Sequence, residues 1–432
     1  MRHHRAQQRA IGSFVAATLT LLAACADDGR DAETGLVYED VEIDTITAPP
    51  ASARGAQEYL QSGEGVAEGE PLRIAWLNES HDWNVSLRAA TELVNRELDG
   101  VRGRPIEILS CGTAEPILQC AERVKDLEPV LALIGKTDTR HRHLRQALAD
   151  IPAVTVEPED PEAWNDPFTH HFTLGSVGVL RAAATWAAAL PPEKSHNSIL
   201  VLAPYAEALE GTLDELEGTP VSALVLAGDE ARNAEGVIAD ALERLGAKPD
   251  GRTLIVNALE QDGCVSLARA VDPRVADPAW GDIEVVTTGA CAGKKVHDEL
   301  GDWPPEWYHV GAGPDLQTYE LDPQVRVYRD RITRYGGPSA DWTATNSLPF
   351  AALLTILRIL TPILADTTET THDDVNEAIA SYTGPGYMGM PEHRCGFDPA
   401  RTSLCVRHAR MFLYTGQRDW RNIVGEPFLL KD

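Results

Sequence analysis

The sequence predicts an α/β fold built as two Rossmann-like lobes, each a mostly parallel sheet covered by helices. Short apolar runs alternate with helical stretches from about residue 72 onward, and this alternation is typical of parallel strands joined by crossover helices. The alternation pauses and then starts again near Leu180. The folded part, roughly 360 residues, also suits two lobes better than one.

The first lobe is expected at residues 71–172, where strands and helices follow one another in a regular series. The expected strands are 72–77, 105–109, 130–134 and 153–156. The expected helices are 85–98, 117–127 and 142–150. In the first helix Leu87, Ala90, Val94 and Leu98 fall on one face, and Gly100 follows where a C-cap is expected.

The second lobe is expected at residues 173–315 and repeats the same series. Its expected strands are 198–203, 221–227, 254–259, 284–288 and 307–310. Its expected helices are 182–190, 206–216, 237–245, 265–271 and 296–300.

Residues 316–432 change in character and are expected to supply closing helices and a strand shared between the lobes. Helices are predicted at 350–365 and 373–382, and a strand at 411–416. The first of these helices is strongly apolar, but sixteen residues are too few to cross a bilayer. Arg358 lies in its middle and Pro362 near its end, so a buried core helix is predicted.

Residues 1–24 have the features of a secretory signal peptide. Arg2, Arg5 and Arg9 form a basic start, an apolar run follows, and Ala23 and Ala24 supply small residues for a peptidase. Cys25 stands directly after them, and the stretch resembles the lipobox of bacterial lipoproteins, whose cysteine is lipidated. The alternative is an ordinary signal with a chance cysteine. The resemblance implies a membrane-anchored protein on the extracytoplasmic face of the cell membrane.

Residues 25–70 combine the lipidated Cys25 with an acidic tether. Residues 26–70 hold twelve acids against Arg30 and Arg54. Such a segment buries too little apolar surface to offset its ordering entropy, and like charges extend it.

The formal net charge is −28. A surface this acidic repels phosphate backbones, which argues against nucleic-acid binding.

Cysteine usage fits an exported protein. Six cysteines remain besides Cys25, and they allow fifteen pairings. They are Cys111, Cys120, Cys264, Cys291, Cys395 and Cys405. An oxidising compartment favours disulfides between the near neighbours 111/120 and 395/405, which leaves 264 with 291. A metal site is the alternative, but the sequence has no CxxC motif and no Cys/His cluster at zinc spacing.

An ordered series of segments resembles one known family. The series is PLRIAW, LRAATELVNRELDGVRGRPIEILSC, CAERVKDLEPVLALIG, GPGYMGM and RMFLYTGQRDWRNI. Together these are similar to type I periplasmic binding proteins of the leucine/isoleucine/valine kind, the solute receptors of ABC importers, over about residues 71–425. The resemblance implies two lobes joined by three crossovers, with the first lobe receiving a return of the chain after about residue 315. It also implies a monomer that closes on a small solute and docks on a membrane permease.

Ligands of this fold bind between the lobes, at the carboxyl ends of the strands. The resemblance therefore implies that Asn78, Glu79, Ser80 and Trp83 are candidates after the first strand. Trp83 either covers a ligand or packs as part of a lid.

The loop after the third strand reads Lys136, Thr137, Asp138, Thr139. In relatives this loop holds a ligand carboxylate with hydroxyls and backbone N–H groups, a role that suits Thr137 and Thr139; the alternative is a helix N-cap. Lys136 favours a carboxylate ligand and Asp138 opposes it. Glu157, after the fourth strand, is expected to face the same cleft.

In the second lobe the candidates are Tyr205, Gly228, Asp229, Gly289 and Ala290. Amino-acid receptors of the family place an acid near the last of these loops to meet the ligand's ammonium group. Residues 288–291 contain no acid, which argues against a simple branched-chain amino acid unless Asp229 or Glu157 substitutes.

The sequence shows no catalytic set, no cofactor motif and no metal site. Motifs such as HExxH, GxSxG, a Walker loop or GxGxxG are absent at strand–helix junctions. His141 with His143, and His170 with His171, are interpreted as surface histidines. The predicted function is capture of a small polar solute for an ABC importer. The alternatives are a receptor of the same fold that senses or scaffolds without a transporter, and an extracellular hydrolase.

Overall fold

The structure of the protein is a computed structural model. It describes residues 52–110, 115–136, 141–157, 164–190, 195–209, 212–213, 216, 221–246, 251–311, 322–337, 344–366, 370–390, 392–399, 401–406, 408–416, 419–422 and 428–429.

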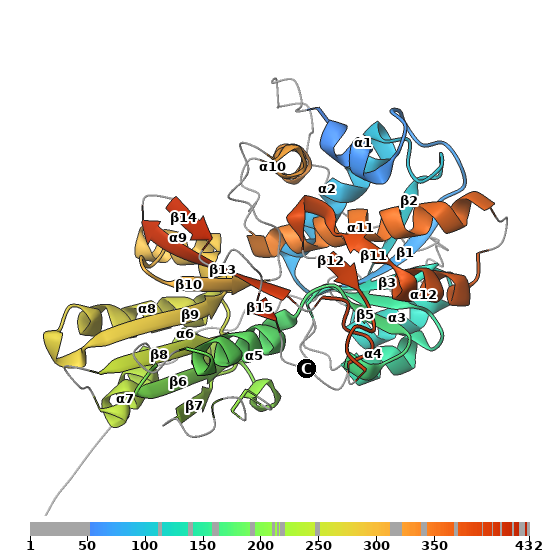
Figure 1. Ribbon diagram of the computed structural model, residues 1–432. Coiled ribbons are helices and arrows are strands. Elements are labelled where there is room, and N and C mark those ends of the chain that lie inside the picture. Colours follow the sequence, from blue (N-terminus) through green and yellow to red (C-terminus); the bar gives the residue numbers. More distant parts are fainter. Residues whose placement is uncertain are drawn as a thin grey trace, which may run out of the picture. The chain divides into compact units, whose positions relative to one another are not determined.

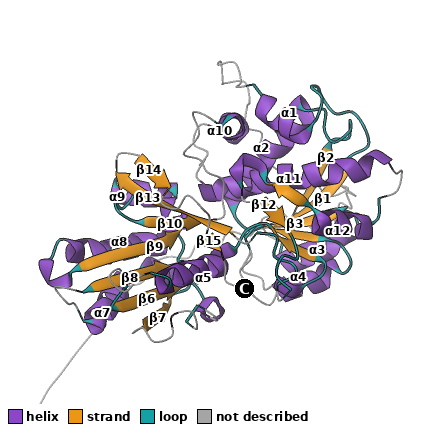
Figure 2. Ribbon diagram, in the orientation of Figure 1, coloured by secondary structure: helices purple, strands orange, loops and turns teal. Residues whose placement is uncertain are grey.

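The first sheet has five parallel strands in the order β2-β1-β3-β4-β5 (Figures 1 and 2). The strands are β1 (Leu72–Leu77), β2 (Ile106–Ser110), β3 (Leu131–Ile134), β4 (Ala153–Thr155) and β5 (Thr169–His171). Ile74 pairs with Ile108 on one side and with Leu131 on the other. The order turns back at β1, so the loops after β1 and β3 leave the same edge of the sheet side by side.

Helices cover both faces of this sheet, as the apolar runs predict. They include α2 (His81–Glu97), α3 (Ile117–Lys125) and α4 (His141–Leu148). Ile74 and Trp76 belong to the core that contains α2, whereas Ala75 and Leu77 belong to the core that contains α3 and α4. Successive side chains of β1 point to opposite faces of the sheet, so the strand contributes to both cores.

The second sheet has parallel strands followed by an antiparallel extension, in the order β14-β13-β10-β9-β8-β6-β7, with β15 paired to β13. The parallel strands are β6 (Ser198–Ala203), β7 (Val221–Val225), β8 (Arg252–Asn257), β9 (Asp282–Thr288) and β10 (Tyr308–Gly311). The antiparallel strands are β13 (His408–Gly416), β14 (Asp419–Asn422) and β15 (Phe428–Leu429).

The helices of the second sheet are α5 (Gly175–Ala188), α6 (Gly228–Arg232), α7 (Glu235–Leu245), α8 (Gln261–Val275) and α9 (Lys294–Leu300). Ile199 and Val201 of β6 face the core that includes α5, and Leu200 and Leu202 face the core that includes α7 and α8. Figure 2 shows the strands of each sheet flanked by helices.

The chain passes between the two sheets three times, as the resemblance implied. It leaves the first sheet after β5 and the second sheet after β10. It then forms α10 (Pro323–Gly336) and α11 (Ala344–Asp366), which both pack against α2 of the first lobe. Next come α12 (His372–Ser381) and the pair β11 (Thr383–Pro385) and β12 (Glu392–Arg394), before β13 joins the second sheet.

The prediction that residues up to 70 form a tether is wrong for part of that segment. Residues Arg54–Leu60 form helix α1, and Ala56, Tyr59 and Leu60 are buried in the first-lobe core. Helix α1 packs against α10 and α11. The sequence did not predict this helix because it is short, lies in an acidic segment, and packs against apolar residues that are distant in the sequence.

Two further predicted details differ. Within the predicted helix 206–216 the described residues include a 3-10 turn, Ala206–Leu209, and form no α-helix. Gly211, a poor helix former, stands two residues after that turn in the sequence. Helices α6 and α10, and strands β5, β11, β12, β14 and β15, were not predicted. Most of them are short, and α10 is strongly polar, so their apolar signal is weak.

Helix α11 is buried, as predicted. Residues Asn346–Leu364 are long and apolar enough to cross a membrane by composition, with a mean hydropathy of 1.8, yet 72% of the apolar stretch is buried within the protein. Phe350, Leu353 and Leu357 are fully buried in the first-lobe core.

Cys264 is bonded to Cys291 and Cys395 to Cys405, which are two of the three favoured pairs. Cys120 is also disulfide-bonded. Cys111 and Cys25 lie outside the described residues, so lipidation and the 111/120 pairing stay predictions.

Candidate functional site

Asn78 joins the loops that follow β1 and β3. Its amide nitrogen donates to the Ser80 carbonyl at 2.6 Å and to Asn84 Oδ1 at 2.9 Å. Its Oδ1 accepts the backbone N–H of Lys136 at 3.0 Å. Both amide hydrogens are used inside the protein, so this predicted ligand residue acts first as a clamp that fixes Lys136 at the end of β3.

Gly135 makes this clamp possible. A Cβ at this position would lie 2.5 Å from the Trp76 ring and 2.6 Å from Asn78 Oδ1, far inside van der Waals contact. Only glycine therefore allows the β3 loop to approach β1 so closely.

Lys136 forms an ion pair with a residue of the second lobe. Its Nζ lies 2.5 Å from Glu260 Oε2, and the two side chains are 32% and 51% exposed. Glu260 follows β8 and is the N-cap residue of α8. The contact therefore joins the carboxyl end of a first-sheet strand to the carboxyl end of a second-sheet strand.

Glu157 lies beside this ion pair. Burial raises the pKa of its carboxyl to about 7; Lys136 opposes the rise and the negative charge of Glu260 adds to it. Its Oε2 is buried and has no hydrogen-bond partner among the described residues. Near neutral pH this carboxyl group is therefore divided between its charged and neutral forms.

Other first-lobe candidates lie in different surroundings. Ser80 is half-buried and is the N-cap residue of α2. Trp83 is 1% exposed and belongs to the first-lobe core. This position fits the interpretation that Trp83 packs within the protein better than the interpretation that it covers a ligand. Thr137, Asp138 and Thr139 lie outside the described residues.

Tyr205 follows β6, and its hydroxyl lies 3.3 Å from Ser176 Oγ at the start of α5. Its ring packs against the second-lobe core. The contact with Ser176 of α5 therefore positions the Tyr205 hydroxyl near the carboxyl end of β6.

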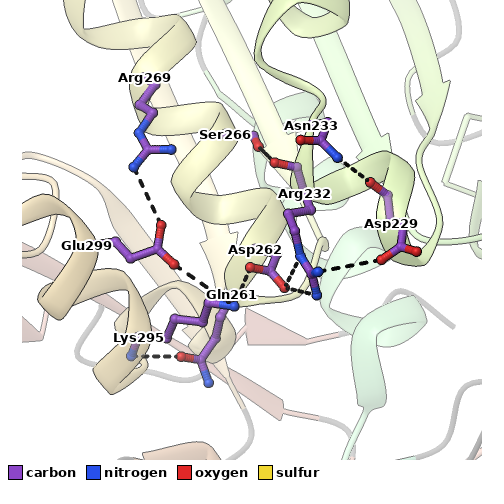
Figure 3. A network of polar contacts seen from close by, with 9 residues as sticks. All are labelled: Asp229, Arg232, Asn233, Gln261, Asp262, Ser266, Arg269, Lys295 and Glu299. Carbon is purple, nitrogen blue, oxygen red and sulfur yellow. Dashed lines mark hydrogen bonds and ion pairs between the residues drawn. The ribbon is translucent and has the colours of Figure 1, made fainter. Parts of the chain in front are cut away.

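Asp229 takes part in a surface network instead of meeting Lys136. Gly228 begins α6, and the Asp229 side chain is 93% exposed and lies 3.7 Å from Arg232 Nη1. Figure 3 shows Arg232 also reaching Asp262 of α8, at 3.3 Å. Lys295 Nζ of α9 meets the same Asp262 at 2.5 Å. The network ties α6, α8 and α9 together and neutralises Asp262, two residues after Glu260.

Gly289 and Ala290 lie in a 3-10 turn, Gly289–Ala292, and the Ala290 N–H donates to the hydroxyl of the N-cap residue Thr288 at 3.3 Å. Cys291 in this turn is bonded to Cys264 of α8.

Asn257, at the end of β8, connects the two second-lobe loops. Its amide nitrogen donates to Thr287 Oγ1 at 2.9 Å, and its Oδ1 accepts the N–H of Leu259 at 3.2 Å. With the disulfide, this bond pattern fixes the short loop that carries Glu260.

Glu260 was not among the predicted site residues. The predicted strand ran to residue 259, whereas β8 ends at Asn257. The signal that could have found it is an acid directly before an amphipathic helix, which is typical of a helix N-terminus following a strand.

One cluster among the described residues has metal-ligating atoms close together: His170, Cys395 and Cys405. Both cysteines are in the disulfide, so neither offers a thiolate to a metal. His170 Nε2 lies 2.8 Å from Asn376 Oδ1, and His141 Nε2 lies 3.3 Å from Asp166 Oδ2. These histidines are therefore engaged with protein groups. His170 and His171 are both buried, so the interpretation of this pair as surface histidines is wrong.

No family model and no curated protein matches the sequence. Solved structures do match the fold. One is a possible leucine/isoleucine/valine-binding protein from Rhodopirellula baltica (TM-score 0.59, 13% identity, 83% of this chain and 97% of that chain covered). Another is a fatty acid ABC transporter substrate-binding protein from Thermomonospora curvata (TM-score 0.60, 11% identity, 85% of this chain and 95% of that chain covered). A third is an ABC transporter substrate-binding protein from Desulfitobacterium hafniense in complex with Leu (TM-score 0.54, 13% identity, 82% of this chain and 100% of that chain covered). The chain therefore has the two-lobed α/β fold of type I periplasmic binding proteins.

Proposed function

We propose that this chain is an extracytoplasmic solute-binding lipoprotein that captures a small polar ligand between its lobes and delivers it to an ABC importer. The observation that carries the proposal is the charged group formed by Lys136, Glu157 and Glu260. These residues come from strand ends of both sheets, where parallel sheets bind their ligands.

The three passages of the chain between the sheets support capture by hinge closure. In such a mechanism the ligand shifts an existing equilibrium between open and closed forms by binding the closed form better. The function requires no covalent step, and no residue is assigned a catalytic role.

The similar proteins support the importer as partner, because two of them are named as substrate-binding proteins of ABC transporters. Their names give a fatty acid and leucine as ligands. The loop at residues 288–291 of this chain lacks an acid, so we propose a polar solute other than a simple branched-chain amino acid.

A thermal-shift screen of the purified chain tests solute binding. The panel should contain amines, amino acids, carboxylates and sugars at 1 mM. A solute at 100 times its dissociation constant stabilises the folded state by about 2.7 kcal/mol, which raises the melting temperature by several degrees. If no solute shifts the melting temperature, and equilibrium dialysis also finds no binding, the proposed function is wrong.

The Cys25→Ala variant tests the lipid anchor. The stretch from Arg2 to Cys25 motivates it. We expect the variant to be released from the membrane fraction or to keep its signal peptide, as seen by fractionation and mass spectrometry. A variant that is cleaved normally and stays in the membrane fraction would contradict the anchor.

A further inference from the structure

The charges at the strand ends do not balance. Among the described residues that act on one another here, two carboxyl groups, those of Glu157 and Glu260, lie beside one cation, Lys136. The nearest acid in the chain after Glu260 is Asp262, and it already has Arg232 and Lys295 as partners (Figure 3). The described part of the site thus has more negative than positive charge.

The buried oxygen of Glu157 is the second observation. Its Oε2 has no hydrogen-bond partner among the described residues. A buried polar atom without a partner costs free energy, and a buried carboxylate costs more unless a cation pairs with it. The position therefore favours a group that brings both positive charge and N–H donors.

We infer that the solute carries a positively charged amine or guanidine group, that this group binds between Glu157 and Glu260, and that Lys136 occupies the place of that group until the solute arrives. This inference rests on the proposed function and names the chemical class of its ligand. The Lys136–Glu260 contact is half-exposed, so breaking it costs little. Lys136 is then free to turn toward solvent.

The pH dependence has a definite sign. The charged groups that act on Glu157 are Lys136, from the loop after β3, and Glu260, from the start of α8. A bound cation favours the ionised carboxylate and lowers its pKa from about 7. Binding should therefore release a proton near neutral pH. The affinity should rise as the pH increases through 7 and level off above it.

Calorimetric titration with agmatine and putrescine at pH 8 tests the inference, with succinate and leucine as solutes of other charge. Lys136→Met should tighten amine binding by about two- to fivefold, because the amine no longer displaces the lysine from a half-exposed ion pair. Glu260→Gln and Glu157→Gln should each weaken it by about 10–100-fold. Glu260→Asp should restore part of the affinity.

Lys294→Met is the matched control. It removes a second-lobe lysine that pairs with the carboxylate of Asp298 in the same helix, and the two side chains are 55% and 52% exposed. Its affinity for amines should equal that of the unaltered protein. Circular dichroism melting of each variant checks that it is folded.

Three outcomes overturn the inference. If Lys136→Met weakens binding, the lysine contacts the ligand directly instead of holding its place. If only succinate, leucine or another solute without a net positive charge binds, the ligand class is wrong while solute binding stands. If neither these four solutes nor any solute of the thermal-shift panel binds, both the class and the proposed function fail.

Discussion

Replacing Cys264 and Cys291 together with alanine should lower the free energy of unfolding by roughly 3–4 kcal/mol. The two cysteines are 27 residues apart, and their bond restricts the unfolded chain by closing that loop. Both are fully buried. The loss should appear as a lower midpoint in urea unfolding followed by circular dichroism.

The same variant should also weaken solute binding, because the bond holds the turn Gly289–Ala292 to the helix that Glu260 caps. The pair Cys395→Ala with Cys405→Ala is the stability control. It opens a loop of only 10 residues, so its loss should be smaller, by roughly 1 kcal/mol. Equal stability of the Cys264/Cys291 variant and the unaltered protein would contradict the prediction.

Arg331→Met should lower the free energy of unfolding by roughly 2–4 kcal/mol. The Arg331 side chain is 1% exposed, and its Nε and Nη2 donate to Glu97 of α2 at 2.7 and 2.5 Å. Arg331 also pairs with Asp330, and the Tyr335 hydroxyl donates to Glu97 at 3.1 Å. Removing the guanidinium leaves two carboxylates without their cation. The expected loss of unfolding free energy is smaller than for a fully buried ion pair, because the Glu97 side chain is 23% exposed and reaches solvent.

Arg54→Met is the control for this prediction. Arg54 pairs with Glu58 at 2.6 Å, but the two side chains are 78% and 61% exposed. Its loss should change stability by less than about 0.5 kcal/mol. If Arg331→Met is as stable as Arg54→Met, the buried pair does not hold α10 on α2.

The fold was largely predictable because parallel strands buried on both faces read as short apolar runs. The prediction of 72–77 matches β1, and 198–203 matches β6. Helix α1 was missed because Tyr59 and Leu60 find their partners on α10 and α11, near the other end of the sequence. Helix α10 was missed because its buried face includes the charged Arg331, which a count of apolar residues passes over.

Of the charged group formed by Lys136, Glu157 and Glu260, the sequence pointed only to the first-lobe residues. Glu157 was a candidate because it directly follows a predicted strand of the first sheet, and Lys136 lies in the loop after another, where it was expected to favour a carboxylate ligand. Their partner Glu260 comes from the second sheet, and no local pattern relates the two loops. The hydrogen bonds of Asn78 could not be predicted either, because they depend on Gly135 allowing the loops after β1 and β3 to come into contact.

Solute binding between the lobes is tested most directly by hydrogen–deuterium exchange of the protein with and without a bound solute from the screen. We predict slower exchange in peptides that contain residues 78–80, 135–136 and 157 of the first lobe and, at the same time, residues 258–260 of the second. The outer helices α3, α4 and α7 should be unchanged. Protection confined to one lobe, or to those outer helices, would contradict binding between the lobes.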